Sequence, residues 1–420
     1  METEFNKLNI SNTKNCSYCN KPFIEELWCI ECDPFRIMEG WTSESPDINK
    51  FIKDTMYDVR NSKQAYVYEF LEWVPFDRFT DIKKIGEGGF SKVYSATWID
   101  GKLEYFRINN GNYKKEEFKP PKKLKIHWNL SKTYGLKLYG LSKDPETKEF
   151  IMVIEFADKG NLSGSLSNNF NNIFWKHKIK LLHDSSFDLR ELHKLGYFHK
   201  DFHSGNILRL SDFASYISDF GLSGPAIEQK SDEKVYGVLP YIAPEVLNRE
   251  PYTSCADIFS FGVVMAELSS GKPPFYNKKH NLSLALSICN GSRPEFGNGT
   301  PGFYKKLAYK CMDANPGERP TAYELDDILK FWYYSIRGEK DDKEEFGHKG
   351  KEINEAFEEA DKEIPTISTS YEKNSNAVYT SAFTFSNLLP KPVNSSIIIS
   401  YINNEACDSQ LIDLEVSNSI

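Results

Sequence analysis

Hydrophobic and polar positions along the chain predict a strand-rich segment followed by a helix-rich one. Residues 151–157 form an apolar run that is typical of a buried strand. The strongest apolar run, residues 259–268, belongs inside a larger core. Upstream, we predict helices over residues 48–56 and 65–73, within a linker that spans residues 41–78.

The C-terminal region, residues 336–420, has a different pattern. A solvated charge cluster follows Arg337 and continues into a predicted amphipathic helix that carries Phe346, Ile353 and Phe357. From Pro365 onward Ser, Thr, Asn and Pro dominate, which predicts disorder with short apolar patches such as residues 397–399.

Composition limits the classes of function. A chain of 420 residues suggests two or three folded units, and a net charge of −8 argues against bulk nucleic-acid binding. No apolar run approaches the 18 or more residues that a membrane span needs, so we expect no membrane association. The N-terminus lacks the apolar centre of a signal peptide, and we expect an intracellular, cytoplasmic location.

Three short segments carry candidate chemistry. Residues 199–206 have the sequence His-Lys-Asp-Phe-His-Ser-Gly-Asn, residues 219–221 are Asp-Phe-Gly, and residues 243–245 are Ala-Pro-Glu. Together they supply a carboxylate for a substrate hydroxyl and an Asn–Asp pair able to hold a divalent metal against phosphates. The order and spacing indicate phosphoryl transfer. The alternative is a solvated loop with helix-capping Asp and Asn.

At these segments the chain resembles the eukaryotic protein kinases, roughly from residue 79 to residue 331. The resemblance implies an α+β, two-lobed kinase-like fold over residues 79–335, with a small antiparallel β N-lobe and a mainly helical C-lobe. It implies that Asp201 orients the substrate hydroxyl and accepts its proton, with Lys200 and His203 beside it in the catalytic segment. Asn206 and Asp219 would be the ligands of Mg²⁺.

The same resemblance implies an ATP site. A glycine-rich hairpin over residues 85–93 would let backbone N–H groups approach phosphate oxygens, although Gly-x-Gly also marks ordinary turns. The strand at 151–157 would end in the hinge that meets adenine, although core packing alone would explain it. The implied nucleotide-binding residues are Ile85, Gly86, Glu87, Gly88, Val93, Ile154, Glu155 and Ala157.

Two further positions match structural landmarks of kinases. Asp257 stands where a buried carboxylate accepts backbone N–H bonds from the catalytic loop, the alternative being a helix N-cap. Arg319 stands where an arginine pairs with the glutamate of Ala-Pro-Glu, here Glu245.

The upper lobe departs from the kinase pattern. Arg107 stands where a strand lysine is usual, and Lys123 where a helix glutamate is usual. Pro120 and Pro121 forbid a continuous helix, so only residues 122–130 can be helical. Arg107 is a weak candidate for the phosphate-binding cation, with Lys122 and Lys125 as rivals, and a solvated basic loop explains all three. A pseudokinase-type scaffold is therefore the alternative function.

Substrate class follows in part from the catalytic segment. His203 and the residues after it resemble the tyrosine-kinase-like group, whose members mostly phosphorylate serine and threonine. Residues 237–241 lack the threonine found there in many serine/threonine kinases, which leaves tyrosine open. Lys200 replaces the usual arginine and could pair with a phosphorylated activation segment.

A separate motif occupies residues 1–40. Two cysteine pairs, each with two intervening residues, suit tetrahedral Zn²⁺ in a zinc-ribbon-like element; they are Cys16, Cys19, Cys29 and Cys32. With the following residues, this motif resembles a kinase family expanded in arbuscular mycorrhizal fungi. The expected partners are ATP and a protein substrate, with protein partners for the zinc element or the tail and no nucleic acid.

Overall fold

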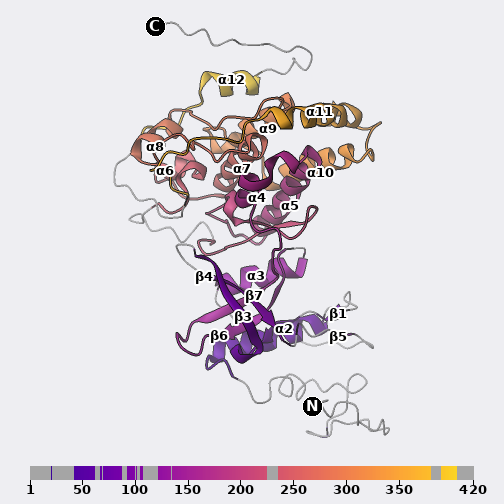
Figure 1. Cartoon of the computed structure of the whole chain (residues 1–420), viewed down its shortest axis with the longest axis vertical. Helices are drawn as coiled ribbons and strands as arrows, with labels where there is room; N and C mark the ends of the chain where they lie inside the picture. Colours follow the sequence, from indigo (N-terminus) through magenta and orange to yellow (C-terminus); the bar gives the residue numbers. More distant parts are fainter. Residues whose placement is uncertain are drawn as a thin grey trace. The chain divides into compact units, whose positions relative to one another are not determined.

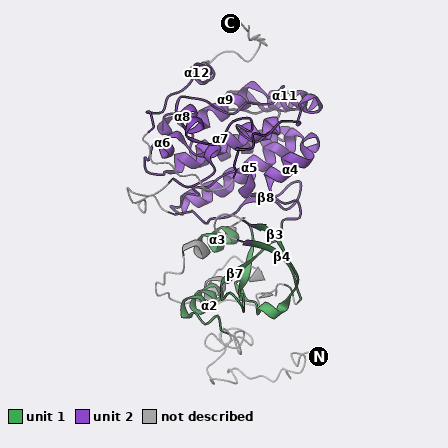
Figure 2. Ribbon diagram, turned by 60° about the vertical axis from the view of Figure 1, so that its left-hand side comes forward, with its two compact units in different colours: residues 1–86, 93–155 green, residues 87–92, 156–420 purple. Residues whose placement is uncertain are grey.

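The computed structural model describes residues 20, 42–61, 67–68, 70–87, 92–99, 101, 105–106, 122–133, 135–224, 235–379 and 389–403. The chain divides into two compact units (Figure 2). The first comprises residues 1–86 and 93–155, and the second comprises residues 87–92 and 156–420.

The first unit contains most of the strands. β2 (Glu72–Trp73), β6 (Leu138–Lys143) and β7 (Phe150–Ile154) form a three-stranded sheet, in which β2 runs parallel to β6 and β7 antiparallel to it. The sheet is thus mixed, not wholly antiparallel as predicted. β3 (Phe79–Glu87) pairs with β4 (Lys92–Trp98), and β1 (Val67–Tyr68) pairs with β5 (Tyr105–Phe106).

Two helices build the core of this unit. The core residues come from α2 (Pro46–Asn61), α3 (Lys122–Thr133), β6 and the chain around β2; they are Ile48, Phe51, Ile52, Met56, Phe70, Leu71, Trp128, Leu138 and Leu141. The Thr55 hydroxyl accepts a hydrogen bond from the Leu71 N–H at 3.1 Å, which fixes α2 to the chain entering β2.

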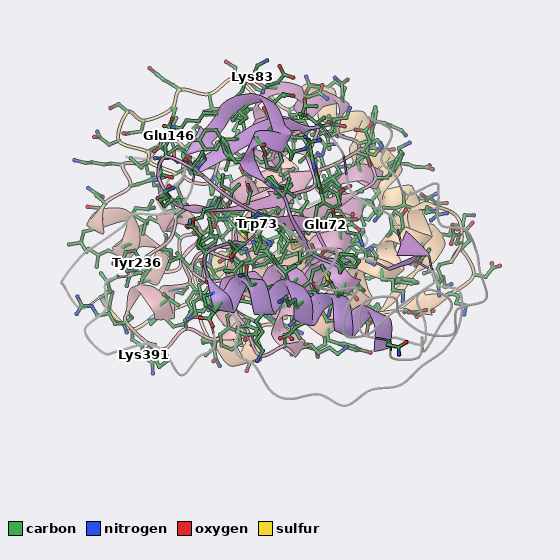
Figure 3. The ribbon with its side chains drawn as sticks, turned by 90° about the horizontal axis from the view of Figure 1, so that it is seen from below. Glu72, Trp73, Lys83, Glu146, Tyr236 and Lys391 are labelled. Carbon is green, nitrogen blue, oxygen red and sulfur yellow. The ribbon has the colours of Figure 1, made fainter. Side chains whose placement is uncertain are left out.

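The predicted helices of this region have different outcomes. The one at residues 48–56 lies within the longer α2. The helix predicted over residues 65–73 is wrong, because β1 and β2 occupy that stretch. Trp73 of β2 packs edge-on against Phe150 of β7, with ring centroids 6.4 Å apart, and the preceding residue, Glu72, is buried. Glu72 and Trp73 are labelled in Figure 3. An aromatic residue on a pleated, half-buried surface favours a strand.

The second unit is mainly helical (Figure 1). Its helices are α4 (Leu162–Asn169), α5 (Trp175–Lys194), α6 (Pro244–Leu247), α7 (Ser254–Ser270), α8 (Leu282–Cys289), α9 (Gly302–Cys311), α10 (Ala322–Ile336), α11 (Gly350–Glu363) and α12 (Ser396–Asn403). α7 is buried from Ala256 to Ser270, which confirms that residues 259–268 lie in a core. Two short ladders complete the unit: β8 (Ile207–Arg209) with β9 (Ser215–Ile217), and β10 (Glu344–Glu345) with β11 (His348–Lys349).

The C-terminal segment is more ordered than its composition predicts. Ile353 and Phe357 are buried on α11, but Phe346 precedes that helix and is half exposed. Disorder from Pro365 onward is wrong for residues 365–379 and 389–403, which bond to the helical unit. The Asn374 N–H donates to the Tyr276 carbonyl at 2.9 Å, and the Val393 N–H donates to the Cys289 carbonyl at 2.9 Å. These backbone hydrogen bonds hold the C-terminal segment on the helical unit although the segment is poor in apolar residues. In the part of the chain that the structure describes, no helix is both long and apolar enough to cross a membrane.

Candidate active site

The β8–β9 hairpin places Asn206 and Asp219 at one end of the same ladder. Asn206 directly precedes β8, and Asp219 follows β9 by two residues, while Ile207 pairs with Ile217. Ser218 continues the pairing, since its N–H donates to the Asn206 carbonyl at 2.8 Å. The two predicted metal ligands therefore come together, although they are separated in sequence by a hairpin.

The side chains of this pair present oxygen atoms. The Asn206 amide nitrogen donates to the Asp201 carbonyl at 2.9 Å, which turns its amide oxygen away from that contact. Asp219 has φ +57°, and its carboxylate accepts the Gly221 N–H at 3.1 Å. Amide and carboxylate oxygens suit Mg²⁺, which typically takes one or two carboxylates and completes its shell with water and substrate phosphates. The side chains of Asn206 and Asp219 therefore fit the ligand preference of Mg²⁺. Among the described residues there is no cluster of three or more acids, histidines or cysteines that could hold a metal by themselves.

Asp257 fastens the catalytic segment from behind. Its carboxylate is fully buried and accepts the backbone N–H groups of His199 at 2.9 Å and Lys200 at 3.0 Å. The Tyr252 hydroxyl donates to it at 2.8 Å. Burial raises the pKa of Asp257, but the hydrogen bond and charge of His193 and the backbone hydrogen bond from His199 outweigh it and hold the pKa below its usual range. The predicted contact is confirmed, and the N-cap alternative is wrong, because Thr253 is the N-cap of α7.

Lys200 and Asp219 both adopt left-handed backbone conformations, with φ +67° and +57°. Such conformations are uncommon outside glycine and cost free energy, so the surrounding contacts must hold them. His199 contributes by bonding through its ring to the Ser218 carbonyl at 3.0 Å. Burial lowers the pKa of His199, which favours the neutral ring in this position.

The predicted pair of Glu245 and Arg319 is confirmed. The guanidinium binds the two carboxylate oxygens at 2.6 and 2.8 Å in a bidentate arrangement. Its remaining donors bond to the carbonyls of Cys255 at 2.9 Å and Asp313 at 2.8 Å. The pair thereby joins the Ala-Pro-Glu segment at the start of α6 to the chain ahead of α10.

Sequence reasoning missed a further buried acid, Glu267. It accepts hydrogen bonds from the hydroxyls of Ser204 at 2.9 Å and Tyr241 at 2.7 Å, and these two hydroxyls lie 3.2 Å apart. Burial raises the pKa of Glu267 to about 7, and the two hydrogen bonds oppose that rise. The available signal was a lone carboxylate inside the apolar run 259–268, where an acid needs buried partners.

The predicted nucleotide-binding residues divide between the units. Ile85, Gly86 and Glu87 lie on β3 and Val93 on β4, where Ile85 is 57% and Val93 44% exposed. Ile154 ends β7, and the Glu155 N–H donates to the Lys137 carbonyl at 2.9 Å. Ala157 belongs to the second unit, where its carbonyl accepts the Gly160 N–H at 2.9 Å. Gly88 and Arg107 lie outside the described residues.

α3 shows how the upper lobe differs from the usual kinase pattern. The helix begins at Lys122, directly after the proline pair, and continues to Thr133, three residues beyond the predicted end. It contains no Asp or Glu, so it offers no carboxylate to a lysine of a neighbouring strand. The zinc prediction cannot be followed here, because Cys16, Cys19, Cys29 and Cys32 lie outside the described residues.

Comparison with known proteins identifies the family. Residues 79–329 match the family described as protein tyrosine and serine/threonine kinase. The match covers more than half of the 420 residues, and the chain belongs to this family of protein kinases.

Similar proteins come from several kingdoms. A probable serine/threonine-protein kinase of Dictyostelium discoideum is 29% identical over 61% of this chain and 15% of its own length. The human tyrosine-protein kinase TXK is 30% identical over 58% of this chain and 46% of its own length. The probable serine/threonine-protein kinase CST of Arabidopsis thaliana is 28% identical over 69% of this chain and 77% of its own length. The chain thus spans only a small part of the first of these relatives.

Proposed function

We propose that this chain transfers the γ-phosphate of ATP to serine and threonine hydroxyls of proteins, with tyrosine as a second acceptor, in a signalling role. The observation that supports this most is the convergence of Asn206 and Asp219 at one end of the β8–β9 ladder, with Asn206 bonded to Asp201. The names of the similar proteins include both serine/threonine and tyrosine kinases.

In this proposal each residue of the second unit has a distinct task. Asp201 orients the acceptor hydroxyl and takes its proton as the oxygen attacks phosphorus. Asn206 and Asp219 hold Mg²⁺, which would neutralise charge on the phosphates. Lys200 offers a cation to a phosphorylated activation segment. The proposed nucleotide-binding residues are Ile85, Gly86, Glu87, Gly88, Val93, Ile154, Glu155, Ala157 and, as a weak candidate, Arg107.

A second candidate function is a pseudokinase-type scaffold. The observation that favours it is the absence of any carboxylate from α3, combined with arginine in place of the strand lysine. The second unit has the buried contacts of Asp257 and Glu245, and it could bind partner proteins without transferring phosphate.

Several wider assignments belong to the same proposal. We assign the chain to the tyrosine-kinase-like group and, within it, to the kinase family expanded in arbuscular mycorrhizal fungi. Residues 1–40 would bind Zn²⁺ through their four cysteines, and they or the tail would contact protein partners. The expected location is cytoplasmic.

Two measurements on the full chain test the function. Thermal shift on titration with Mg²⁺–ATP reports nucleotide binding, and radiolabel transfer from [γ-³²P]ATP to the chain and to serine-, threonine- and tyrosine-containing peptides reports turnover. We expect both signals from the wild type. Asp201→Asn should lower label transfer by about 100-fold or more and keep the thermal shift, because it removes the base and keeps the shape.

The outcomes separate the two candidates. A thermal shift without label transfer would select the scaffold and exclude the kinase. Equal transfer by the wild type and Asp201→Asn would exclude Asp201 as the base. Asp219→Asn is the matched variant for the metal, and it should abolish the part of the thermal shift that depends on Mg²⁺.

A further inference from the structure

His203 is held in one orientation beside Asp201. Its ring nitrogen Nδ1 accepts the backbone N–H of Gly205 at 3.0 Å, at the start of the short 3-10 turn Ser204–Asn206. A nitrogen that accepts a hydrogen bond carries no proton, so in the neutral ring the proton lies on Nε2. That nitrogen lies 3.8 Å from the Asp201 carboxylate oxygen Oδ2.

The residues around the ring leave it little freedom. A Cβ on Gly205 would lie 2.7 Å from Cε1 and 2.9 Å from Nδ1 of His203, so any larger residue at 205 would displace the ring. On another side the ring packs against Tyr241, with centroids 5.7 Å apart. Tyr241 is itself fixed by its hydrogen bond to Glu267 at 2.7 Å. Contacts thus link Glu267 of α7 through Tyr241 and His203 to the Asp201 carboxylate.

The separation from Asp201 has a chemical consequence. A distance of 3.8 Å exceeds a direct hydrogen bond, so the ring does not capture the carboxylate oxygen. It acts on that oxygen through the positive end of its Nε2–H dipole. The side chain of Asp201 is 6% exposed and that of His203 13%, so water screens this interaction only weakly.

We infer that His203 is the positioning residue of Asp201: its Nε2–H group, fixed by Gly205 and Tyr241, directs the carboxylate toward the acceptor hydroxyl. This inference rests on the proposed function. In the step concerned, the hydroxyl oxygen forms a bond to the γ-phosphorus as the bond from phosphorus to the β,γ-bridging oxygen breaks. That electron pair remains on ADP, and the hydroxyl proton passes to Asp201.

Two substitutions separate positioning from loop structure. His203→Asn keeps an acceptor near the place of Nδ1 for the Gly205 N–H but has no donor near the place of Nε2. His203→Gln reverses this, because its longer side chain brings an N–H donor near the place of Nε2 and gives up the Nδ1 contact. We expect His203→Asn to lower kcat by about 100-fold, with the KM for ATP unchanged within about twofold, because only the reacting geometry is lost. His203→Gln should retain kcat within about tenfold of the wild type.

A third variant completes the test. Gly205→Ala keeps the histidine and displaces its ring, so it should lower kcat about as much as His203→Asn. Equal kcat for His203→Asn and the wild type would overturn the inference and leave the kinase function standing. So would a loss in His203→Gln that equals the loss in His203→Asn, since the role would then be structural. A wild-type chain that transfers no label would overturn the proposed function and this inference together.

Discussion

The two units of the chain are stabilised in different ways. In the helical unit, buried polar groups join segments that are far apart in sequence: Asp257 binds the catalytic segment, and Glu245 binds Arg319. In the first unit, the core of α2, α3 and β6 is apolar, and most residues of the β3–β4 hairpin are exposed. The family match starts at residue 79, but the core of the first unit includes residues from Ile48 onward.

This comparison shows where kinase motifs constrain the chain. The helical unit has the buried charged residues that the kinase motifs predict, Asp257 and the pair of Glu245 and Arg319. Each buried carboxylate needs a specific partner, so few replacements are tolerated at these positions. The core cluster of the first unit consists of apolar residues, for which volume matters more than identity, so a segment preceding the family match can contribute α2 and β2 to it. The first two of the three predictions below test this difference by hydrogen exchange, which reports the opening free energy of each helix separately.

The largest effect is expected from the buried ion pair. Arg319→Met leaves the Glu245 carboxylate buried without its cation, which typically costs about 3–5 kcal/mol. The opening free energy of α7 amides should fall by that amount, and that of α2 amides by less than about 1 kcal/mol.

A surface pair provides the matched control for this variant. Arg337 binds Glu339 at 2.8 Å, and both side chains are about half exposed. Arg337→Met should change the opening free energy by no more than about 1 kcal/mol, since exposed pairs contribute little. Equal effects of the two substitutions would show that burial of the pair of Glu245 and Arg319 does not make it more important for stability than an exposed pair.

A somewhat smaller effect is expected in the first unit. Ile52 is fully buried on α2, and Ile52→Ala should lower the opening free energy of α2 amides by about 2–5 kcal/mol through lost burial and a cavity. The control is Ile82→Ala on β3, where the side chain is 41% exposed and the change should stay within about 1 kcal/mol. If Ile52→Ala leaves α2 unchanged, residues 46–61 are only a linker, as the sequence suggested.

The smallest effect is pH-dependent and concerns Glu267. Burial raises its pKa from 4.5 to about 7 in the folded chain, so between these values the folded state holds a proton that the unfolded state releases. The stabilisation from this carboxyl is complete below pH 4.5 and is lost as the pH rises to about 7. The pKa difference corresponds to at most about 3 kcal/mol.

Glu267→Gln removes this titration and keeps the size of the side chain. Relative to the wild type, the variant should gain free energy of unfolding as the pH rises from about 4.5 to about 7. Subtracting the two proteins cancels the other titrating groups. A difference that does not change with pH would show that Glu267 keeps its charge throughout this range.

Much of the helical unit could be predicted from sequence because its motifs carry their own chemistry. The burial of residues 259–268 follows from their apolar residue types, and the backbone partners of Asp257 and the pair of Glu245 with Arg319 follow from the resemblance to protein kinases. The start of α3 was predictable for a local reason, since the rings of Pro120 and Pro121 exclude a helix before residue 122.

Other features depended on contacts that no local pattern records. Within residues 65–73, pairing with β5 and β6 made residues 67–68 and 72–73 strands. The Asn394 side chain bonds to the Ala314 N–H at 2.8 Å and to Asp313 at 3.0 Å, which secures a tail whose composition suggested disorder.

The sequence by itself determined the kinase family, the candidate ligands of Mg²⁺ and the candidate base, because these depend on residue types at fixed spacing. Only the tertiary structure decided that α2 belongs to the core of the first unit and that the tail binds the helical unit. It also placed Glu267, Tyr241 and His203 in one line of contacts toward Asp201. The physical reason is that burial and hydrogen bonding between distant segments set the free energy of these arrangements, and local propensity contributes little to it.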